Sequence, residues 1–232
     1  MDEELMIKKK PEISGANLAR ARQLADYTRK WMLALLWLAI PNAIANVLTN
    51  NIYLLRSDLL YIIGSVIRYI CMILEICFFI KLRREEEEYF QCVKLAIGVL
   101  IAYSVAGVLY RSESLTVKFI ALFAECISVV LFCIRTYHEC NAHAMVIYRV
   151  DRDITKKWLC LWKWIVIGNA GVLVGSLLLV YQRVDRVLLS VRIGLVLSPV
   201  MLLVSAIAAV LRMVYLEKTA NAMKDYVKYY TS

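Results

Sequence analysis

The stretch LLYIIGSVIRYICMILEICFFI, Leu59–Ile80, decides the fold class of this protein. About 20 consecutive apolar residues span a bilayer as a helix, and this stretch is long enough to do so. It does not alternate between apolar and polar residues, as the strands of a lipid-facing β-barrel would. The whole chain shares this character, since 61% of its 232 residues are hydrophobic and its mean hydropathy is +0.63. The sequence therefore predicts an all-α membrane protein.

Six apolar stretches of this kind follow one another along the chain. We place the predicted spans at approximately residues 31–48, 59–80, 93–109, 117–134, 158–180 and 193–211, within a six-helix transmembrane domain at 31–218. Short connections between successive spans predict three helical hairpins with both termini on one side. Residues 1–30 are polar and carry several cations, so we expect a short amphipathic helix on the membrane surface before the first span. Residues 219–232 are expected to form a C-terminal tail.

The distribution of positive charge indicates which side faces the cytoplasm. Three quarters of the 28 Lys and Arg residues fall on the side that holds both termini. The positive-inside rule then places both termini in the cytoplasm of a cell-membrane protein. The net charge of +9 does not require a nucleic-acid partner, because attraction to anionic lipid head groups uses the same charge.

The chain also carries a weak internal repeat. LAIP at residues 38–41 recurs as LAIG at residues 95–98, an offset of 57 residues, and IVIG at 165–168 resembles both. Each copy opens a helix that runs in the same direction in the predicted hairpins. The pattern favours an internal repeat, as is common in membrane transporters.

Two further stretches, YHECNAHAM (137–145) and YLEKTANAM (215–223), share the pattern Y-x-E-x-x-A-x-A-M. The first contains the residue types of a metal site, but its His138, Cys140 and His143 become Leu216, Lys218 and Asn221 in the second. The shared alanines therefore favour helix packing over metal binding, and we predict no metal or cofactor. Glu139 and Glu217 are expected to lie beyond the apolar core, in contact with water.

Charges inside the predicted spans are the most informative residues, because such charges are unfavourable in a bilayer and are usually paired or functional. Arg68 and Glu125 lie at similar depth on parallel helices, and we predict an ion pair between them. The predicted polar layer near the middle of the membrane consists of Asn42, Arg68, Tyr103, Glu125 and Asn169. Glu75 is a second intramembrane charge, whose candidate donors are Tyr69, Arg135 and the polar layer itself.

Two functions remain open at this stage. The polar layer can be a site for an ion, a small solute or a lipid head group in a permease-like or transport-associated protein, or it can be a structural clamp. Alternatively, the chain is a scaffold or regulatory subunit. It then forms a homo-oligomer or binds a partner membrane or cytoplasmic subunit through its N-terminal helix, the Glu85–Glu88 turn and its cytoplasmic helix extensions. The sequence contains no nucleophile-elbow, zinc-protease or P-loop motif, so we predict no catalytic residues and no enzyme. Its seven cysteines form no disulfide framework and are expected to be reduced.

Overall fold

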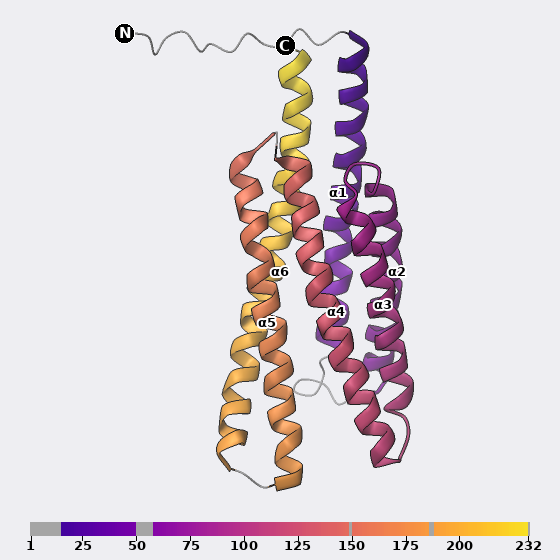
Figure 1. Cartoon of the computed structure of the whole chain (residues 1–232), viewed down its shortest axis with the longest axis vertical. Coiled ribbons are helices and arrows are strands. Elements are labelled where there is room, and N and C mark those ends of the chain that lie inside the picture. The colour runs from indigo at the N-terminus through magenta and orange to yellow at the C-terminus, as the bar shows by residue number, and fades with distance from the viewer. Residues whose placement is uncertain (1–14, 50–57, 149, 186–187, 232) are drawn as a thin grey trace, which may run out of the picture.

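The computed structural model describes residues 15–49, 58–148, 150–185 and 188–231, and these residues form six α-helices (Figure 1). The helices are α1 (Gly15–Thr49), α2 (Asp58–Leu82), α3 (Glu88–Leu109), α4 (Leu115–Ile147), α5 (Arg152–Asp185) and α6 (Leu188–Thr231). Each of the last five predicted spans lies within one helix. The described residues contain no strand, in agreement with the predicted all-α class.

Five of these helices have stretches long and apolar enough to cross a membrane, namely Leu59–Leu82, Glu88–Leu109, Thr116–Ile147, Arg152–Gly175 and Ile193–Asp225. These helices support a multi-pass membrane protein. The stretch predicted as the first span falls in α1, which is not among the five. Its apolar part contains Asn42, Asn46 and Pro41 and is preceded by Arg29 and Lys30.

The structure differs from the prediction of a separate helix on the membrane surface. The part of residues 1–30 that the structure describes, from Gly15 onward, belongs to the continuous helix α1. Residues 15–30 are rich in good helix formers and contain no proline, so no boundary arises between them and the apolar part. Residues 1–14 lie outside the described part of the chain.

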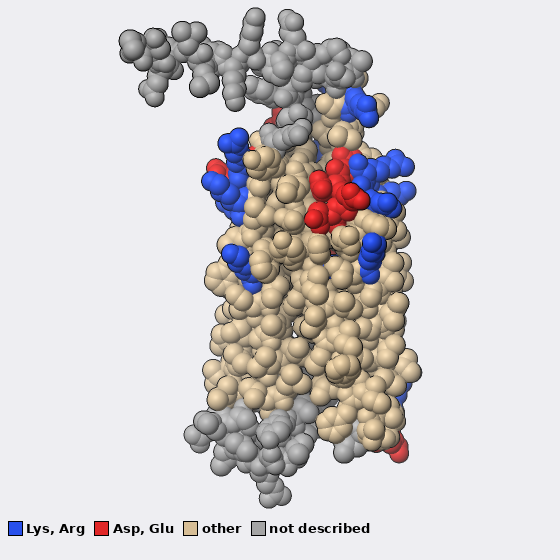
Figure 2. Space-filling model, in the orientation of Figure 1, with Lys and Arg blue, Asp and Glu red and all other residues tan. Residues whose placement is uncertain are grey.

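Consecutive helices run antiparallel, and each packs on the next (Figure 1). Helix α6 also packs on α1, which closes the bundle, and it touches α4. We use the term charged end for the end of the bundle that holds the start of α1, the end of α6, and the turns at residues 83–87 and 148–151. On the face shown in Figure 2, charged side chains gather toward this end and a broad uncharged band fills the middle.

Close contact between helices depends on glycine. Gly168 and Gly175 of α5 face α6, where an added Cβ atom would lie 3.0 Å from the backbone nitrogen of Ser205 and 3.2 Å from that of Ser198, respectively. Gly64 of α2 approaches α1 in the same way, since its added Cβ would lie 2.6 Å from Cβ of Leu48. Small residues of this kind let helix backbones pack closely in membranes.

The main buried core lies toward the charged end. Its largest members come from all six helices and include Met32, Phe79, Tyr89, Ile147, Trp158 and Leu216. Further along the bundle, large apolar side chains face outward, as with Phe123 of α4, which is 68% exposed. An apolar outer surface is what a helix bundle surrounded by lipid requires.

Candidate functional site

Four charged side chains meet inside the bundle near the charged end, and we call them the ionic hub: Glu75, Arg135, Glu139 and Arg212. Nη1 of Arg135 donates to Oε2 of Glu75 at 2.7 Å, and Nη2 of Arg212 donates to Oε1 of the same carboxylate at 2.8 Å. Nε of Arg212 donates to Oε1 of Glu139 at 2.8 Å. The guanidinium groups of α4 and α6 thus neutralise the carboxylates of α2 and α4.

Helical spacing on α4 builds one side of the hub. Arg135, Glu139 and His143 are four residues apart and therefore share a face of the helix. Nη2 of Arg135 lies 3.9 Å from Oε2 of Glu139, and Nε2 of His143 lies 3.6 Å from Oε1 of Glu139. Glu139 and His143 therefore lie on one face of α4.

Aromatic and polar side chains of α3, α5 and α6 continue the contacts of the hub through His143. The hydroxyl of Tyr89 lies 2.7 Å from Nδ1 of His143, in hydrogen-bonding contact. The ring of Trp158 packs against His143 with 4.5 Å between centroids, and its Nε1 donates to Oγ1 of Thr219 at 3.0 Å. Tyr89, His143, Trp158 and Thr219 are fully buried, so this polar chain is enclosed by the core.

Burial makes the pairing within the hub necessary. Glu139 is only 2% exposed and Arg135 only 4%. An unpaired charge in such surroundings is strongly destabilising, whereas a paired and hydrogen-bonded one is tolerated. The expectation that Glu139 lies in water is therefore wrong. Its counterpart Glu217 in the second motif is exposed, as expected.

The hub lies at the charged-end edge of the apolar band, away from the middle of the bundle. The thiol of Cys92 is 4.0 Å from the carbonyl oxygen of Arg135, and the exposed Lys94 follows two residues later on α3. On α2, the exposed Lys81 follows Glu75 by six residues, or about 9 Å of helix. Water and lipid head groups therefore lie within about two helical turns of the hub.

The predicted ion pair between Arg68 and Glu125 is wrong. The guanidinium of Arg68 lies over the ring of Tyr103, 4.5 Å from its centroid, and Tyr110 donates a 2.6 Å hydrogen bond to Oε2 of Glu125. Both tyrosines come from α3 or the residue after it. Helix α3 packs on both α2 and α4, and at the level of Arg68 and Glu125 its tyrosines meet each charge separately.

The other predicted members of the polar layer do not join Arg68 and Tyr103 in any contact that the structure records for the described residues. Nδ2 of Asn169 donates to the carbonyl oxygen of Ile165 in its own helix at 2.7 Å. Asn42 is half-buried on α1. Glu75, predicted as a secondary charge with Arg135 as one candidate donor, is instead central to the hub and does pair with Arg135.

The repeated motif acts mainly in packing. Ala142, Ala144 and Ala220 are buried at helix contacts, as the alanine spacing indicates. The metal-like residues separate, because His138 turns outward to pair with Glu88 at 2.7 Å while His143 turns inward. His143 and Cys140 are both buried. Among the described residues, no group of three or more His, Cys, Asp and Glu side chains is arranged to hold a metal ion.

Sequence reasoning missed Arg212 as a site residue, because it directly follows the last predicted span and reads as a flanking cation. The signal in the sequence was the four-residue spacing of Arg135, Glu139 and His143 beside the alanines of the motif, together with Glu75 inside a predicted span.

Comparisons of the chain with protein-family models, curated proteins and solved structures give no match. The function must therefore be argued from the residues themselves.

Proposed function

We propose that this protein is a multi-pass scaffold or regulatory subunit of the cell membrane, with both termini in the cytoplasm and no catalytic chemistry of its own. Six spans arranged as three helical hairpins are consistent with the antiparallel order of the helices. The gathering of Lys and Arg at the charged end supports a cytoplasmic position for that end. The exposed Trp37, Ile40 and Ile44 of α1 support a lipid-facing stripe and hence a sixth span.

The observation that carries this proposal is a pair of helices that project from the bundle. α6 has 44 residues and α1 has 35, so they are about 66 and 52 Å long, against about 30 Å for a bilayer core. At the charged end both extend past the turns that join the other helices (Figure 1). We call residues 15–27 and 217–231 of these two helices the α1/α6 projection.

The hub attaches the base of this projection to the bundle. Arg212, one turn before the projection begins on α6, is held by carboxylates from α2 and α4. Ala25 and Met223, within the projection, belong to the same buried cluster as the bundle core. Such a helix pair is a fixed surface in the cytoplasm, which suits a protein that positions a partner.

The first test is native mass spectrometry of protein extracted gently from its own membrane. We expect a stoichiometric complex with a second chain that survives Glu125→Gln and Asn169→Ala but is lost on combined Lys218→Glu and Lys224→Glu, two exposed changes in the projection. An unchanged complex in the double lysine variant would contradict a scaffold role for the projection.

A permease-like function is the second candidate. Arg68 and Glu125 favour it, because each sits in a membrane-compatible helix without an opposite charge among the described residues, and such charges often mark transport pathways. In the same measurement, a small bound solute or ion that is lost on Glu125→Gln or Arg68→Gln would favour this candidate over the scaffold.

A further inference from the structure

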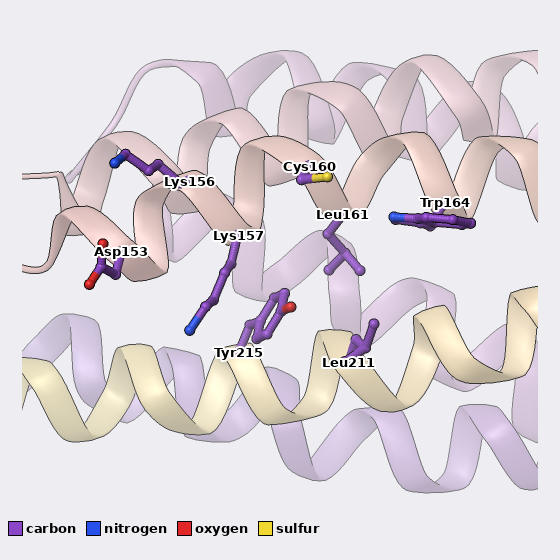
Figure 3. A pocket seen from close by; sticks show the side chains of 8 residues that line it. All are labelled: Asp153, Lys156, Lys157, Cys160, Leu161, Trp164, Leu211 and Tyr215. Carbon is purple, nitrogen blue, oxygen red and sulfur yellow. The ribbon is translucent and has the colours of Figure 1, made fainter.

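A groove runs between α5 and α6 on the outside of the bundle, at the charged-end edge of the apolar band (Figure 3). Lys157, Leu161 and Trp164 of α5 line it at spacings of four and three residues, so they share one face of that helix. From α6, Tyr215 lies beside Lys157, and Leu211 faces Leu161 across the groove (Figure 3). Lys156 and Asp153 lie at the end of the groove that is nearer to the charged end of the bundle.

The polarity of the groove changes along its length. Lys156 and Lys157 are exposed near the start of α5, whereas Trp164 lies about 10 Å further along the helix from Lys157. Leu161, Trp164 and Leu211 make the deeper part apolar, and Tyr215 is amphipathic. Trp and Tyr prefer this level of a membrane, where head groups meet acyl chains. The order of charged, amphipathic and apolar groups along the groove matches the order of charged head group and apolar acyl chain in a phospholipid.

The lysines are available for an outside ligand. Within the part of the chain that the structure describes, neither Lys156 nor Lys157 forms an ion pair with a carboxylate of the protein. Among the described residues that line the groove, Asp153 is the one acidic residue, and it lies in the first turn of α5, where a carboxylate suits the helix dipole. Two cations against one anion leave an excess of positive charge at the mouth.

From this geometry we propose that the α5–α6 groove binds one anionic phospholipid of the cytoplasmic leaflet. The ammonium groups of Lys156 and Lys157 contact its phosphate, and an acyl chain lies against Leu161, Trp164 and Leu211. Basic pockets between membrane helices on the cytoplasmic side bind anionic lipid head groups in this way. The proposal does not depend on the α1/α6 projection binding a partner.

The test uses full-length protein in bilayer nanodiscs that contain phosphatidylglycerol and phosphatidylcholine, ejected intact into a native mass spectrometer. We expect one retained phosphatidylglycerol and a roughly 10- to 30-fold loss of its apparent affinity in Lys156→Gln with Lys157→Gln, because each lysine near the surface strengthens anionic-lipid binding. Raising the salt concentration should weaken binding to the unmodified protein more than to the variant.

Lys94→Gln provides the matched control, because Lys94 is an exposed lysine at a similar level on α3, away from the groove. It should retain the lipid as the unmodified protein does. Trp164→Ala tests the apolar half and should shorten lipid retention without changing the preference for phosphatidylglycerol. Equal retention in the double glutamine variant and the Lys94→Gln control would overturn the proposal. Displacement of the lipid by millimolar glycerol phosphate would also overturn it, since the site would then bind a free phosphate.

Discussion

At the scale of single residues, the hub balances two guanidinium groups against two carboxylates. Each arginine reaches both carboxylates, either by a hydrogen bond or by a longer ion pair. Removal of one member therefore affects every remaining pair. Buried ion pairs contribute little net stability as a set, but breaking one leaves an uncompensated charge and is strongly destabilising.

Arg212→Met should destabilise the protein by about 3–5 kcal/mol, because it leaves Glu75 and Glu139 to share Arg135. At about 2–4 °C per kcal/mol, the midpoint of thermal unfolding in detergent should fall by roughly 6–20 °C. Arg20→Met, which removes an exposed arginine of α1, should leave the midpoint unchanged. The combined change Arg212→Met and Glu75→Met restores neutrality and should recover part of the loss. Equal midpoints for the Arg212→Met and Arg20→Met proteins would show that the hub charges are not coupled.

At the scale of helices, glycine sets how closely α5 and α6 approach. The positions of Gly168 and Gly175 are opposed by backbone atoms of α6, which cannot move without moving the helix. At Gly171, the three atoms nearest to an added Cβ all belong to the side chain of Met201, whose far end is flexible. Substitutions at the first two positions should therefore have larger effects than the same substitution at Gly171.

Gly168→Ala should lower the thermal midpoint by an amount equivalent to about 1–3 kcal/mol, as overpacking of a close contact does. Gly107→Ala is the control, because its added Cβ would lie 3.9 Å from the hydroxyl of Tyr69, an ordinary contact. That change should leave stability the same or raise it, since Ala favours a helix over Gly. A Gly168→Ala protein as stable as the Gly107→Ala protein would mean that α5 and α6 are not in close contact there.

The helices themselves were predictable, because a long apolar run is a local property of the sequence. The contacts within the site were less so. Arg68 and Glu125 have matching depth, but only the packing order shows that α3 separates them. Arg212 follows an apolar run like any flanking cation, and its burial depends on α2 and α4, which are distant in the chain. Glu75 was recognised because a carboxylate inside a span demands a partner, and Arg135 was one of its candidate donors.

At the scale of the whole molecule, charge is concentrated at one end of the described bundle, where the hub and the core also lie. The exposed Arg83, Glu87 and Lys156 mark this end, and Arg111 and Glu113 mark the opposite turn. The orientation proposed above rests on this asymmetry and on the proposed crossing of the membrane by α1. The orientation and the crossing of α1 can both be tested by chemical labelling from one side of the membrane.

We expect a membrane-impermeant maleimide to label Ser112→Cys and Thr49→Cys in intact cells, and Glu87→Cys only after permeabilisation. Each variant is made in a background with the seven native cysteines replaced by alanine, and its thermal midpoint serves as the folding control. Labelling of Glu87→Cys in intact cells would reverse the proposed orientation. Labelling of Thr49→Cys only after permeabilisation, with Ser112→Cys labelled directly, would mean that α1 does not cross.

The long separations within the hub have a consequence for synthesis. Glu75 precedes Arg135 by 60 residues and Arg212 by 137 residues. At about 5–20 residues per second, Glu75 is synthesised roughly 7–27 s before Arg212, which supplies its second guanidinium. A chain that stops before α6 holds two hub carboxylates against one hub arginine. The buried charges of the hub are therefore balanced only once α6 has joined the bundle.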